Sequence, residues 1–483
     1  MNVKVISLNV GRALLVSALF MFISVLVSVF NGMDSAFGPL AISFIITLIV
    51  GGFPFIFVKK APTITLRDGF LTVVLAWFLS FIFGMLPYVL WGGEFSLINA
   101  WFESVSGFTT TGSTILTDVE ALPKSLLFWR SSTHFIGGLG VVVFLLLVIP
   151  ESSPFRLKLT NIEMSSLSKE GYRYRSSKKV YVILSVYLGI TIGAILSLWA
   201  AGMNLFDAVN HGFSLAATGG FSTKNISVAY YDSNLIYLIC IFFMMLSATH
   251  FGVIFASAVT KSFKPFKTPV IKYFYVATIV LSVVAAISLK ANNFAHSWGE
   301  ALMDGTFQTV CYITTTGFAS ADNSSWPMLA CVVLLFATFQ CGTSGSTSGG
   351  LKADRILIMT KALQLQLKRF LYPTSVSNVK IGNTYVHDDD VLLVMQYIVL
   401  YCLMCVLCVL LLLSCGLGGV EALTGAMASL GNVGPGLGEL GSFGNYGGIP
   451  VFAKLVCTLA MILGRLEIYP LLIVILMMFK RIK

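Results

Sequence analysis

The sequence predicts an all-α integral membrane protein in which one helical unit recurs four times after an N-terminal hairpin. Three observations support this prediction: the composition, the length of the apolar runs and a repeated glycine signature. Of the 483 residues, 57% are hydrophobic and only 11% are charged, whereas a soluble domain carries roughly 25% charged residues. The chain has room for about ten spans of roughly 20 residues. Because the apolar runs are long and continuous, the alternating short strands of a β-barrel are not expected.

The charged residues predict the topology and the class of partner. The formal net charge is +10, but the basic residues gather in alternate segments, namely 59–67, 156–179, 261–272, 352–380 and 480–483. The intervening loops are expected to hold acidic residues, namely Glu103, Asp118, Glu120, Asp232, Asp304, Asp322 and Glu439. This is the positive-inside pattern of a multi-pass protein in a lipid bilayer, and it predicts that both termini are cytoplasmic. The charge therefore indicates topology, and no nucleic-acid partner is expected.

Residues 1–62 are expected to form an N-terminal transmembrane hairpin. Apolar runs from about Ala13 to Phe30 and from about Leu40 to Val58 are joined through Asn31-Gly32. No cleavable signal peptide is expected, so both helices should be retained, although a signal anchor would have a similar pattern.

Four later apolar segments each end at a glycine that follows a short run of small or polar residues. The runs are roughly 98 to 117 residues apart, the spacing expected if one unit of two membrane helices recurs. They are Thr109-Thr110-Thr111-Gly112, Ala216-Ala217-Thr218-Gly219, Thr314-Thr315-Thr316-Gly317 and Gly431-Asn432-Val433-Gly434. The last three residues of each run are predicted to bind ions: Thr110, Thr111, Gly112, Ala217, Thr218, Gly219, Thr315, Thr316, Gly317, Asn432, Val433 and Gly434. Four such strands around one axis can form rings of carbonyls that replace the water shell of a cation.

Each unit is predicted to contain an outer helix, a half-length helix, the glycine strand and a return helix. The units are expected to occupy residues 63–155, 175–265, 268–372 and 385–483. The predicted helices are 70–88, 97–108 and 128–149; 180–200, 205–216 and 234–259; 273–289, 301–313 and 326–339; and 391–414, 420–430 and 451–478. The predicted fold is thus four helix–pore-helix–helix units around one central pore.

The half-helices carry a second regularity. A side chain able to cap a helix lies 12 or 13 residues before each signature glycine, and these are Asn99, Asp207, Asp304 and Glu421. Such residues suit a helix N-terminus, so the carbonyl end of each half-helix should point toward the axis and favour a cation. Glycine adopts the φ values that successive inward carbonyls require. A tight turn or a close helix contact would explain one glycine, but four in phase favour the pore.

The return helix of the third unit is interrupted by residues 341–350, ten residues of mostly Gly, Ser and Thr. Such a segment cannot hold a helix against lipid, so it must be buried in protein or line a cavity. The Gly-Lys-Ser/Thr ending of a phosphate-binding loop is absent from it. A plain cytoplasmic loop is one interpretation. The preferred one is a mobile constriction in the pore, with Gly342, Gly345, Gly349 and Gly350 as residues of the gate.

Arg465 and Glu467 lie inside an apolar run of the fourth unit. A central Arg costs at least about 3 kcal/mol on insertion scales, so it should face protein or water. The two side chains do not share a helix face, so they cannot simply neutralise each other. Arg465 is predicted to be an electrostatic barrier in the pore. The alternative is a structural ion pair, for instance between Glu467 and Arg130.

Taken together in order, these residues resemble the superfamily of cation transporters that includes TrkH, TrkG and KtrB, and the N-terminal hairpin points to the TrkH branch. The matching pieces are Phe108–Gly112, Ala217–Ser222, Thr315–Phe318, Asn432–Gly436, the insert Gly342–Gly350 and Gly464–Glu467. The resemblance implies a homodimer that takes up potassium across the bacterial inner membrane, with K⁺ as the transported ion and no organic cofactor. It also implies a cytosolic nucleotide-binding ring of the TrkA type as partner. Glycine at all four signature positions favours K⁺ over Na⁺, while His250 departs from the family pattern.

Two other functions are compatible with parts of the sequence. A secondary cation symporter, coupled to Na⁺ or H⁺, could have a midplane site built from broken helices, but such folds usually pair two halves and this chain shows four like units. The second of these other functions is a membrane-embedded enzyme. His134, His211 and His250 would lie near membrane depth, but the sequence offers them no nucleophile–base–carboxylate set.

Overall fold

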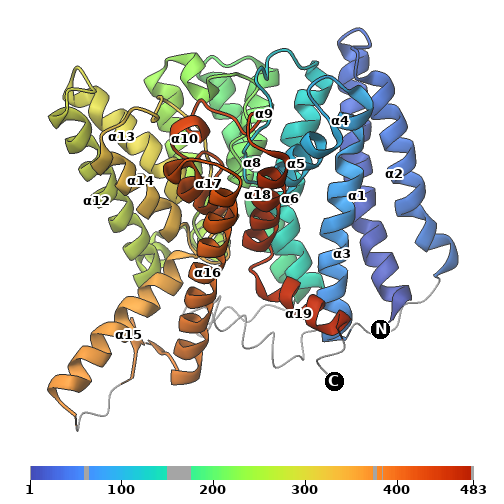
Figure 1. Ribbon diagram of the computed structural model, residues 1–483. Helices are drawn as coiled ribbons and strands as arrows, with labels where there is room; N and C mark the ends of the chain where they lie inside the picture. The colour runs from blue at the N-terminus through green and yellow to red at the C-terminus, as the bar shows by residue number, and fades with distance from the viewer. Residues whose placement is uncertain (1, 59–64, 149–175, 374–377, 383, 480–483) are drawn as a thin grey trace.

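The computed structural model describes residues 2–58, 65–148, 176–373, 378–382 and 384–479. In this part of the chain the protein consists of helices and one short β-hairpin, so the predicted all-α membrane fold is confirmed (Figure 1). Helix α1 (Val3–Phe30) begins, and helix α19 (Tyr469–Met478) ends, at the same end of the helical bundle (Figure 1). The predicted basic clusters at 59–60, 156–175 and 480–483 lie outside the described residues.

The N-terminal hairpin is formed by α1 (Val3–Phe30) and α2 (Phe37–Phe57). The two helices approach closely at Gly11 and Gly51, because a Cβ atom on Gly11 would lie 2.6 Å from the Gly51 carbonyl oxygen. Small residues allow this close packing between membrane helices. Helix α1 also packs against α3 and α6 of the first unit, so the hairpin is attached to that unit.

Unit one contains α3 (Leu66–Gly84), the short α4 (Leu86–Trp91), the half-helix α5 (Leu97–Phe108) and the return helix α6 (Lys124–Val148). Helix α5 packs against α3, α4 and α6 and is held between them. It ends at Thr109, whose N–H still bonds to a carbonyl of α5.

Unit two follows the same order with α8 (Ser176–Ala200), the half-helix α9 (Leu205–Ala217), the 3₁₀ turn η1 (Ser227–Tyr231), α10 (Asn234–Ser247) and α11 (Phe251–Thr260). Unit three contains the turn η2, an outer helix, a half-helix and two separate return segments. These are η2 (Lys264–Lys267), α12 (Pro269–Ala291), α13 (Trp298–Ile313), α14 (Met328–Gln340) and α15 (Ala353–Leu371). Helix α15 projects away from the bundle (Figure 1).

A two-stranded antiparallel hairpin, β1 (Lys380–Ile381) and β2 (Thr384–Tyr385), leads into unit four. Unit four contains an outer helix, a half-helix, a 3₁₀ turn and a bent return helix. These are α16 (Asp388–Ser414), α17 (Gly419–Gly431), η3 (Gly438–Leu440), α18 (Val451–Arg465) and α19 (Tyr469–Met478).

The four units close into a circle. The return helix of each unit packs against the half-helix of the next, in the pairs α6 with α9, α10 with α13, α14 with α17, and α18 with α5. Each half-helix is therefore held by two units, and the four C-terminal ends converge toward the centre of the molecule.

The predicted unbroken helix 234–259 is wrong, because α10 and α11 are bent by 101°. At the bend, the His250 Nδ1 accepts a hydrogen bond from Gly252 N at 3.0 Å and starts a new helix. The carbonyl of Ser247 accepts from the Thr347 hydroxyl at 3.1 Å, so its hydrogen-bonding capacity is used by another segment. Tertiary contacts therefore stabilise a break that the apolar run conceals.

The predicted unbroken helix 451–478 is also wrong, since α18 and α19 are bent by 104°. Glu467 and Ile468 have φ values of 55° and 56°, which lie in the left-handed region and end the helix. Arg465 thus terminates α18 and does not lie in the middle of a long helix.

The half-helices begin before the residues predicted to cap them. The actual caps are Ser96, Asn204 and Ser297, whose side chains accept hydrogen bonds from the N–H groups of Asn99, Asp207 and Glu300. Helix α17 follows Gly418, which has no capping side chain. Asn99, Asp207 and Glu421 therefore occupy the third helical position, where an acidic or amide group still suits the positive helix end, while Asp304 lies deeper in α13.

In the described part of the chain, six helices are long and apolar enough to cross a membrane, or up to eight if each bent pair forms one span. This is fewer than the ten expected from length. One reason is the return path of unit three, where α14 has only 13 residues and a buried loop continues the chain.

Candidate cation pathway

Four strands with the same backbone pattern follow the half-helices, and we call them the signature strands. Each has two residues of left-handed φ separated by one residue outside that region. The left-handed pairs are Thr110 (53°) and Gly112 (84°), Thr218 (53°) and Gly220 (84°), Thr315 (59°) and Gly317 (78°), and Asn432 (53°) and Gly434 (101°). In every unit, the residue between them donates its N–H to a half-helix carbonyl five positions earlier, at 2.8 or 2.9 Å.

This pattern corrects the predicted register of the second strand by one residue. Gly220, and not Gly219, matches the other three signature glycines in φ. Ala217, which was predicted to bind ions, is the last residue of α9. The second strand therefore consists of Thr218, Gly219 and Gly220, and the sequence misled because two glycines stand side by side.

The four strands form a closed ring in which each signature glycine lies against the next strand. A Cβ atom at any of these four positions would come within 3.0 Å of a neighbouring backbone carbonyl oxygen. The contacts run from Gly112 to Gly219, from Gly220 to Thr316, from Gly317 to Val433 and from Gly434 to Thr111. Both the positive φ and this contact require glycine, and the circular order shows that the strands surround one axis.

Hydroxyl groups of the half-helices support the first two strands from behind. Ser106 Oγ donates to the carbonyl of Ser113 at 2.6 Å, and Ser214 Oγ donates to that of Phe221 at 2.8 Å. The fourth strand and the residues just after it are supported differently. Tyr312 donates to the Gly436 carbonyl at 3.0 Å, and the Gly434 carbonyl accepts from Ser113 at 2.9 Å and from Tyr446 at 3.0 Å.

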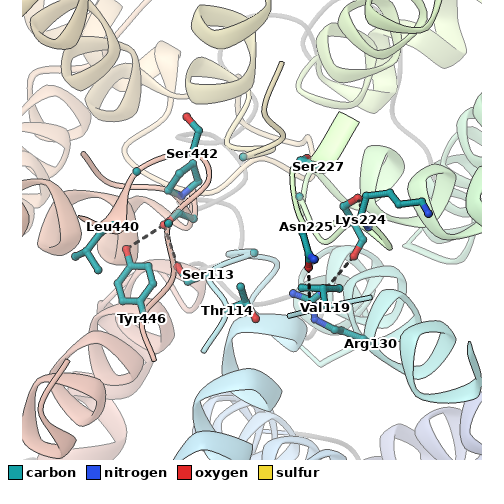
Figure 2. A pocket seen from close by; sticks show the side chains of 18 residues that line it. Ser113, Thr114, Val119, Arg130, Lys224, Asn225, Ser227, Leu440, Ser442 and Tyr446 are labelled. Carbon is teal, nitrogen blue, oxygen red and sulfur yellow. Dashed lines mark hydrogen bonds between the residues drawn. The ribbon is translucent and has the colours of Figure 1, made fainter. Parts of the chain in front are cut away.

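A cavity opens on one face of the ring, on the side of the signature glycines (Figure 2). Its lining includes all four of these glycines, together with Arg130 and Lys224. At its rim, Asn225 donates to Asp118 at 2.8 Å and lowers the pKa of that carboxyl, which is therefore ionised at neutral pH. The cavity is the approach to the ring from this side.

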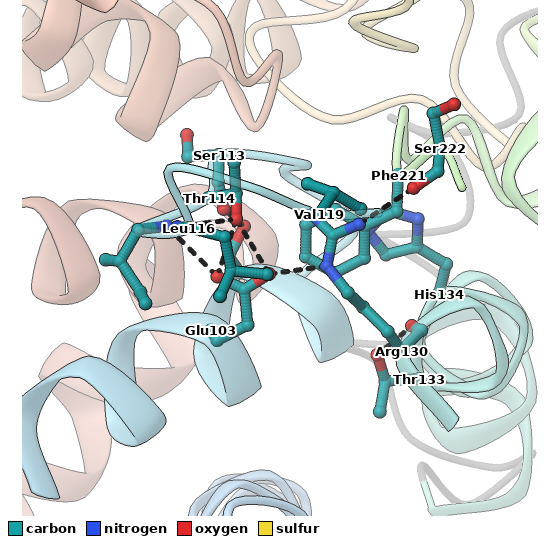
Figure 3. A network of polar contacts seen from close by, with 12 residues as sticks. Glu103, Ser113, Thr114, Leu116, Val119, Arg130, Thr133, His134, Phe221 and Ser222 are labelled. Carbon is teal, nitrogen blue, oxygen red and sulfur yellow. Dashed lines mark hydrogen bonds and ion pairs between the residues drawn. The ribbon is translucent and has the colours of Figure 1, made fainter. Parts of the chain in front are cut away.

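A buried ion pair lies beside this cavity (Figure 3). Arg130 on α6 donates to Glu103 on α5 at 2.5 Å, and the side chains are only 3% and 0% exposed. Arg130 also donates to the Ser222 carbonyl at 3.0 Å. Glu103 was expected in an acidic loop, but its position inside α5 places it within the protein. The alternative pairing of Arg130 with Glu467 is therefore not formed.

The segment 341–350 lies against the opposite face of the ring and is buried apart from Gly345. Gly349 N donates to the Thr315 hydroxyl at 2.9 Å, which links the segment to the third signature strand. Thr347 Oγ1 donates to the Ala216 carbonyl at 3.0 Å, next to the second strand. The segment therefore crosses beneath the ring and touches several units.

Arg465 holds this segment in place. Its guanidinium donates to the Thr347 carbonyl at 2.8 Å and to the Gly137 carbonyl of α6 at 3.0 Å. The side chain is only 4% exposed. It thus bridges the end of α18, the buried segment and unit one directly below the ring.

Glu467 forms its ion pair with Arg355 of α15 at 2.6 Å, and the Arg355 guanidinium lies 4.0 Å from the Tyr397 ring centroid. This pair connects the bend of unit four to the helix that follows the buried segment. Glu467 therefore has a structural partner within the described residues. The sequence could not predict this partner, because the two residues are 112 positions apart.

The contacts of Asn432 and the position of His134 could not be predicted from the sequence. Asn432 donates from Nδ2 to the Thr111 hydroxyl at 3.0 Å and to the Met461 carbonyl at 2.8 Å, so it joins the fourth strand to the first strand and to α18. His134 stacks on Phe221 with ring centroids 4.0 Å apart. The sequence feature that points to Asn432 is that it stands where the other three strands have Thr. For His134 the sequence offers only a polar residue in an apolar run.

Fold and site together define a multi-span membrane protein with four pseudo-symmetric units around one pathway. The sequence model of the TrkH family, described as cation transport protein, matches residues 39–481. The chain belongs to this family, and it is a transporter and not an enzyme.

Relatives match this chain in sequence, and a solved structure matches it in fold, over nearly the whole chain. The Trk system potassium uptake protein TrkH of Halomonas elongata is 33% identical over 475 residues, which cover 97% of each chain. TrkG of Escherichia coli K12 is 33% identical over 488 residues, covering 98% of this chain and 97% of that protein. The crystal structure of the potassium transporter TrkH from Vibrio parahaemolyticus is 32% identical, with a TM-score of 0.88 and 98% of each chain covered.

Proposed function

We propose that this protein takes up K⁺ across the bacterial inner membrane through the ring of signature strands. The relatives named as potassium uptake proteins support the ion and the direction. Membership of a cation transport family supports the class of substrate. K⁺ is then the transported ion and is bound only in passage.

The closed ring of four strands is the observation that carries this proposal. Each strand follows the C-terminal end of a half-helix, where the helix dipole favours a cation. The backbone carbonyls of residues 110–112, 218–220, 315–317 and 432–434 would replace the hydration shell of the ion. Glycine at the third position lets each strand lie directly against the next one around the ring.

The buried segment 341–350 and Arg465 would close the pathway below the ring. The segment contacts the third strand and the end of the half-helix before the second strand, and Arg465 places a positive charge in the same region. An Arg in a cation pathway is an electrostatic barrier, and small polar residues can move without exposing large apolar surfaces. Gly342, Gly345, Gly349 and Gly350 would supply the backbone freedom for that motion, since Gly345 and Gly350 have φ values of 77° and 65°.

The partners remain those that the resemblance implies: a second copy of the chain and a cytosolic nucleotide-binding ring of the TrkA type. Helix α15 supports an intermolecular role because it projects from the bundle and exposes Leu363, Leu367, Phe370 and Leu371 (Figure 1). The basic segments support a cytoplasmic position for both termini.

Uptake of ⁸⁶Rb⁺ and ²²Na⁺ by purified protein in vesicles tests the proposal. We expect Rb⁺ uptake driven by a membrane potential and competed by K⁺, with much less Na⁺ uptake. Uptake that requires a proton or sodium gradient and shows no channel events in bilayer recordings would favour the symporter alternative. Absence of Rb⁺ uptake in every condition, including with the nucleotide-binding partner, would overturn the proposal.

A further inference from the structure

The network around Glu103 and Arg130 holds the ends of two neighbouring signature strands. On the side of unit one, the Glu103 carboxylate accepts from the Thr114 hydroxyl at 3.0 and 3.1 Å and from Ile115 N at 3.1 Å. On the side of unit two, Arg130 donates to the Ser222 carbonyl at 3.0 Å (Figure 3). The ion pair therefore connects the first strand to the second, directly behind the contact of Gly112 with Gly219.

Aromatic stacking extends this connection into the second strand. The Arg130 guanidinium lies 3.5 Å from the Phe221 ring centroid, and the His134 ring stacks on the same Phe221. His134 Nδ1 is 3.2 Å from Ser214 Oγ, and this hydroxyl donates to the Phe221 carbonyl. A Cβ atom on Gly219 would collide with the His134 ring. The position of the second strand is thus fixed by a charged group, a ring and a hydroxyl.

At the position equivalent to Glu103, the other half-helices form no ion pair among the described residues. The residue nine positions before the signature glycine is Glu103 in unit one, His211 in unit two, Gln308 in unit three and Gly425 in unit four. His211 Nε2 lies 2.9 Å from Ser222 Oγ, and Gln308 Nε2 donates to the Ala321 carbonyl at 2.9 Å. Charge-assisted hydrogen bonds are shorter and stronger than neutral ones, so the boundary between the first two strands is the most stiffly held of these contacts.

Stability alone does not account for the ion pair. A buried pair loses about as much free energy by desolvation as it gains by attraction, so apolar replacements are often neutral. Arg130 also lines the cavity above the signature glycines, where an unpaired positive charge would repel an approaching cation. Glu103 cancels that charge while it fixes the position of both strands. The arrangement fits a role in ion passage better than a role in folding.

We propose that the Glu103–Arg130 ion pair determines ion selectivity by setting the spacing between the first and second signature strands. The two residues are positioning residues, since they reach the ion only through the strands. The inference rests on the proposed function. Loss of the pair should let the strands relax toward a smaller cation, because discrimination between K⁺ and Na⁺ depends on how the carbonyls are held.

The test compares Rb⁺ and Na⁺ uptake by Glu103→Gln and by the double variant Glu103→Gln/Arg130→Gln in vesicles. The double variant removes both charges and keeps hydrogen-bonding groups of similar size, so it should fold. We expect its Rb⁺/Na⁺ uptake ratio to fall about tenfold, while uptake continues. Glu103→Gln should show the same fall together with slower Rb⁺ uptake, because Arg130 is left charged beside the cavity. Glu120→Gln is the matched control: Glu120 pairs with Lys224 at the rim, at 3.4 Å, and its loss should leave the ratio unchanged.

The outcomes separate this inference from the proposed function. If the wild-type protein takes up no Rb⁺, the proposed function fails. If the wild-type protein selects Rb⁺ and the folded double variant keeps the same ratio, only the role of the ion pair is refuted. If neither variant folds, Glu103→Asp, which keeps the charge and shortens the side chain, decides: a lowered ratio supports the inference, and an unchanged ratio or a third unfolded variant overturns it.

Discussion

At the scale of single residues, the signature glycines and Arg465 have different physical roles. Each signature glycine has a left-handed φ, and a Cβ atom added to it would lie within 3.0 Å of a carbonyl oxygen of the neighbouring strand. A side chain there must displace the adjacent strand, so the effect falls on the geometry of the ring. Arg465 instead makes hydrogen bonds to two separate segments, so its loss affects how firmly the buried segment is held.

Replacing a signature glycine should weaken both ion selectivity and folding stability. For Gly112→Ser we expect the Rb⁺/Na⁺ uptake ratio to fall about tenfold, with a loss of unfolding free energy of about 1–3 kcal/mol from the strained φ. Gly220→Ser should behave alike, because Gly220 is the equivalent residue in unit two. Flux ratios and thermal unfolding of the purified variants measure both effects. An unchanged ratio in folded Gly112→Ser and Gly220→Ser would contradict the assignment of these strands as the filter.

Removing the Arg465 side chain should raise basal uptake. Hydrogen bonds from a charged donor contribute about 1.5–3 kcal/mol each, so Arg465→Ala should favour release of the segment and increase partner-free Rb⁺ flux about tenfold or more. Arg465→Lys keeps the charge but cannot easily reach both carbonyls, so we expect an intermediate flux. The barrier role is wrong if Arg465→Ala, present at normal levels, conducts no faster than the wild type.

At the scale of elements, the return helices distinguish the four units. Those of units two and four are bent by 101° and 104°, and that of unit three is divided by the buried segment. The carbonyls freed at the bend after α10 accept hydrogen bonds from the segment, as with Ser247 and Thr347. The breaks and the segment therefore stabilise one another, which permits irregular backbone inside a membrane protein.

Shortening the segment should open the pathway. A deletion of three residues within 342–350 would remove contacts such as that of Gly349 with Thr315, and we expect higher basal Rb⁺ flux. Thr347→Val is a milder companion, since it removes only the hydroxyl that bonds to the Ala216 and Ser247 carbonyls. It should raise flux less than the deletion does. A closed phenotype in both well-folded variants would contradict a gating role.

The sequence was sufficient for the repeated units, because glycine periodicity and long apolar runs depend on local composition. It was insufficient wherever tertiary contacts choose between similar options. Gly219 and Gly220 are adjacent, and only the ring contacts show which one faces the third strand. Several basic residues could pair with Glu467 in folds compatible with the sequence. Its actual pairing with Arg355 follows from the bend after α18. A helix break that is stabilised by hydrogen bonds from distant residues cannot be predicted from the residues of the apolar run itself, as with the break after α10.

At the scale of the whole molecule, fourfold pseudo-symmetry governs the ring but not its surroundings. The return helix of each unit packs on the half-helix of the next, and this closes the circle. The charged support lies between units one and two, while the buried segment and Arg465 come from units three and four. Selectivity can therefore depend on all four units while opening depends on two of them.

Single-channel recording of the purified protein in planar bilayers, under opposed K⁺ and Na⁺ gradients, tests directly whether the ring of signature strands conducts K⁺. A ring of backbone carbonyls predicts discrete currents whose reversal potential follows the K⁺ gradient, and Gly112→Ser should shift that potential toward the Na⁺ value. If the currents of the wild type and of Gly112→Ser reverse at the same potential, or if transport occurs without discrete events, the ring of signature strands is not the selective pathway.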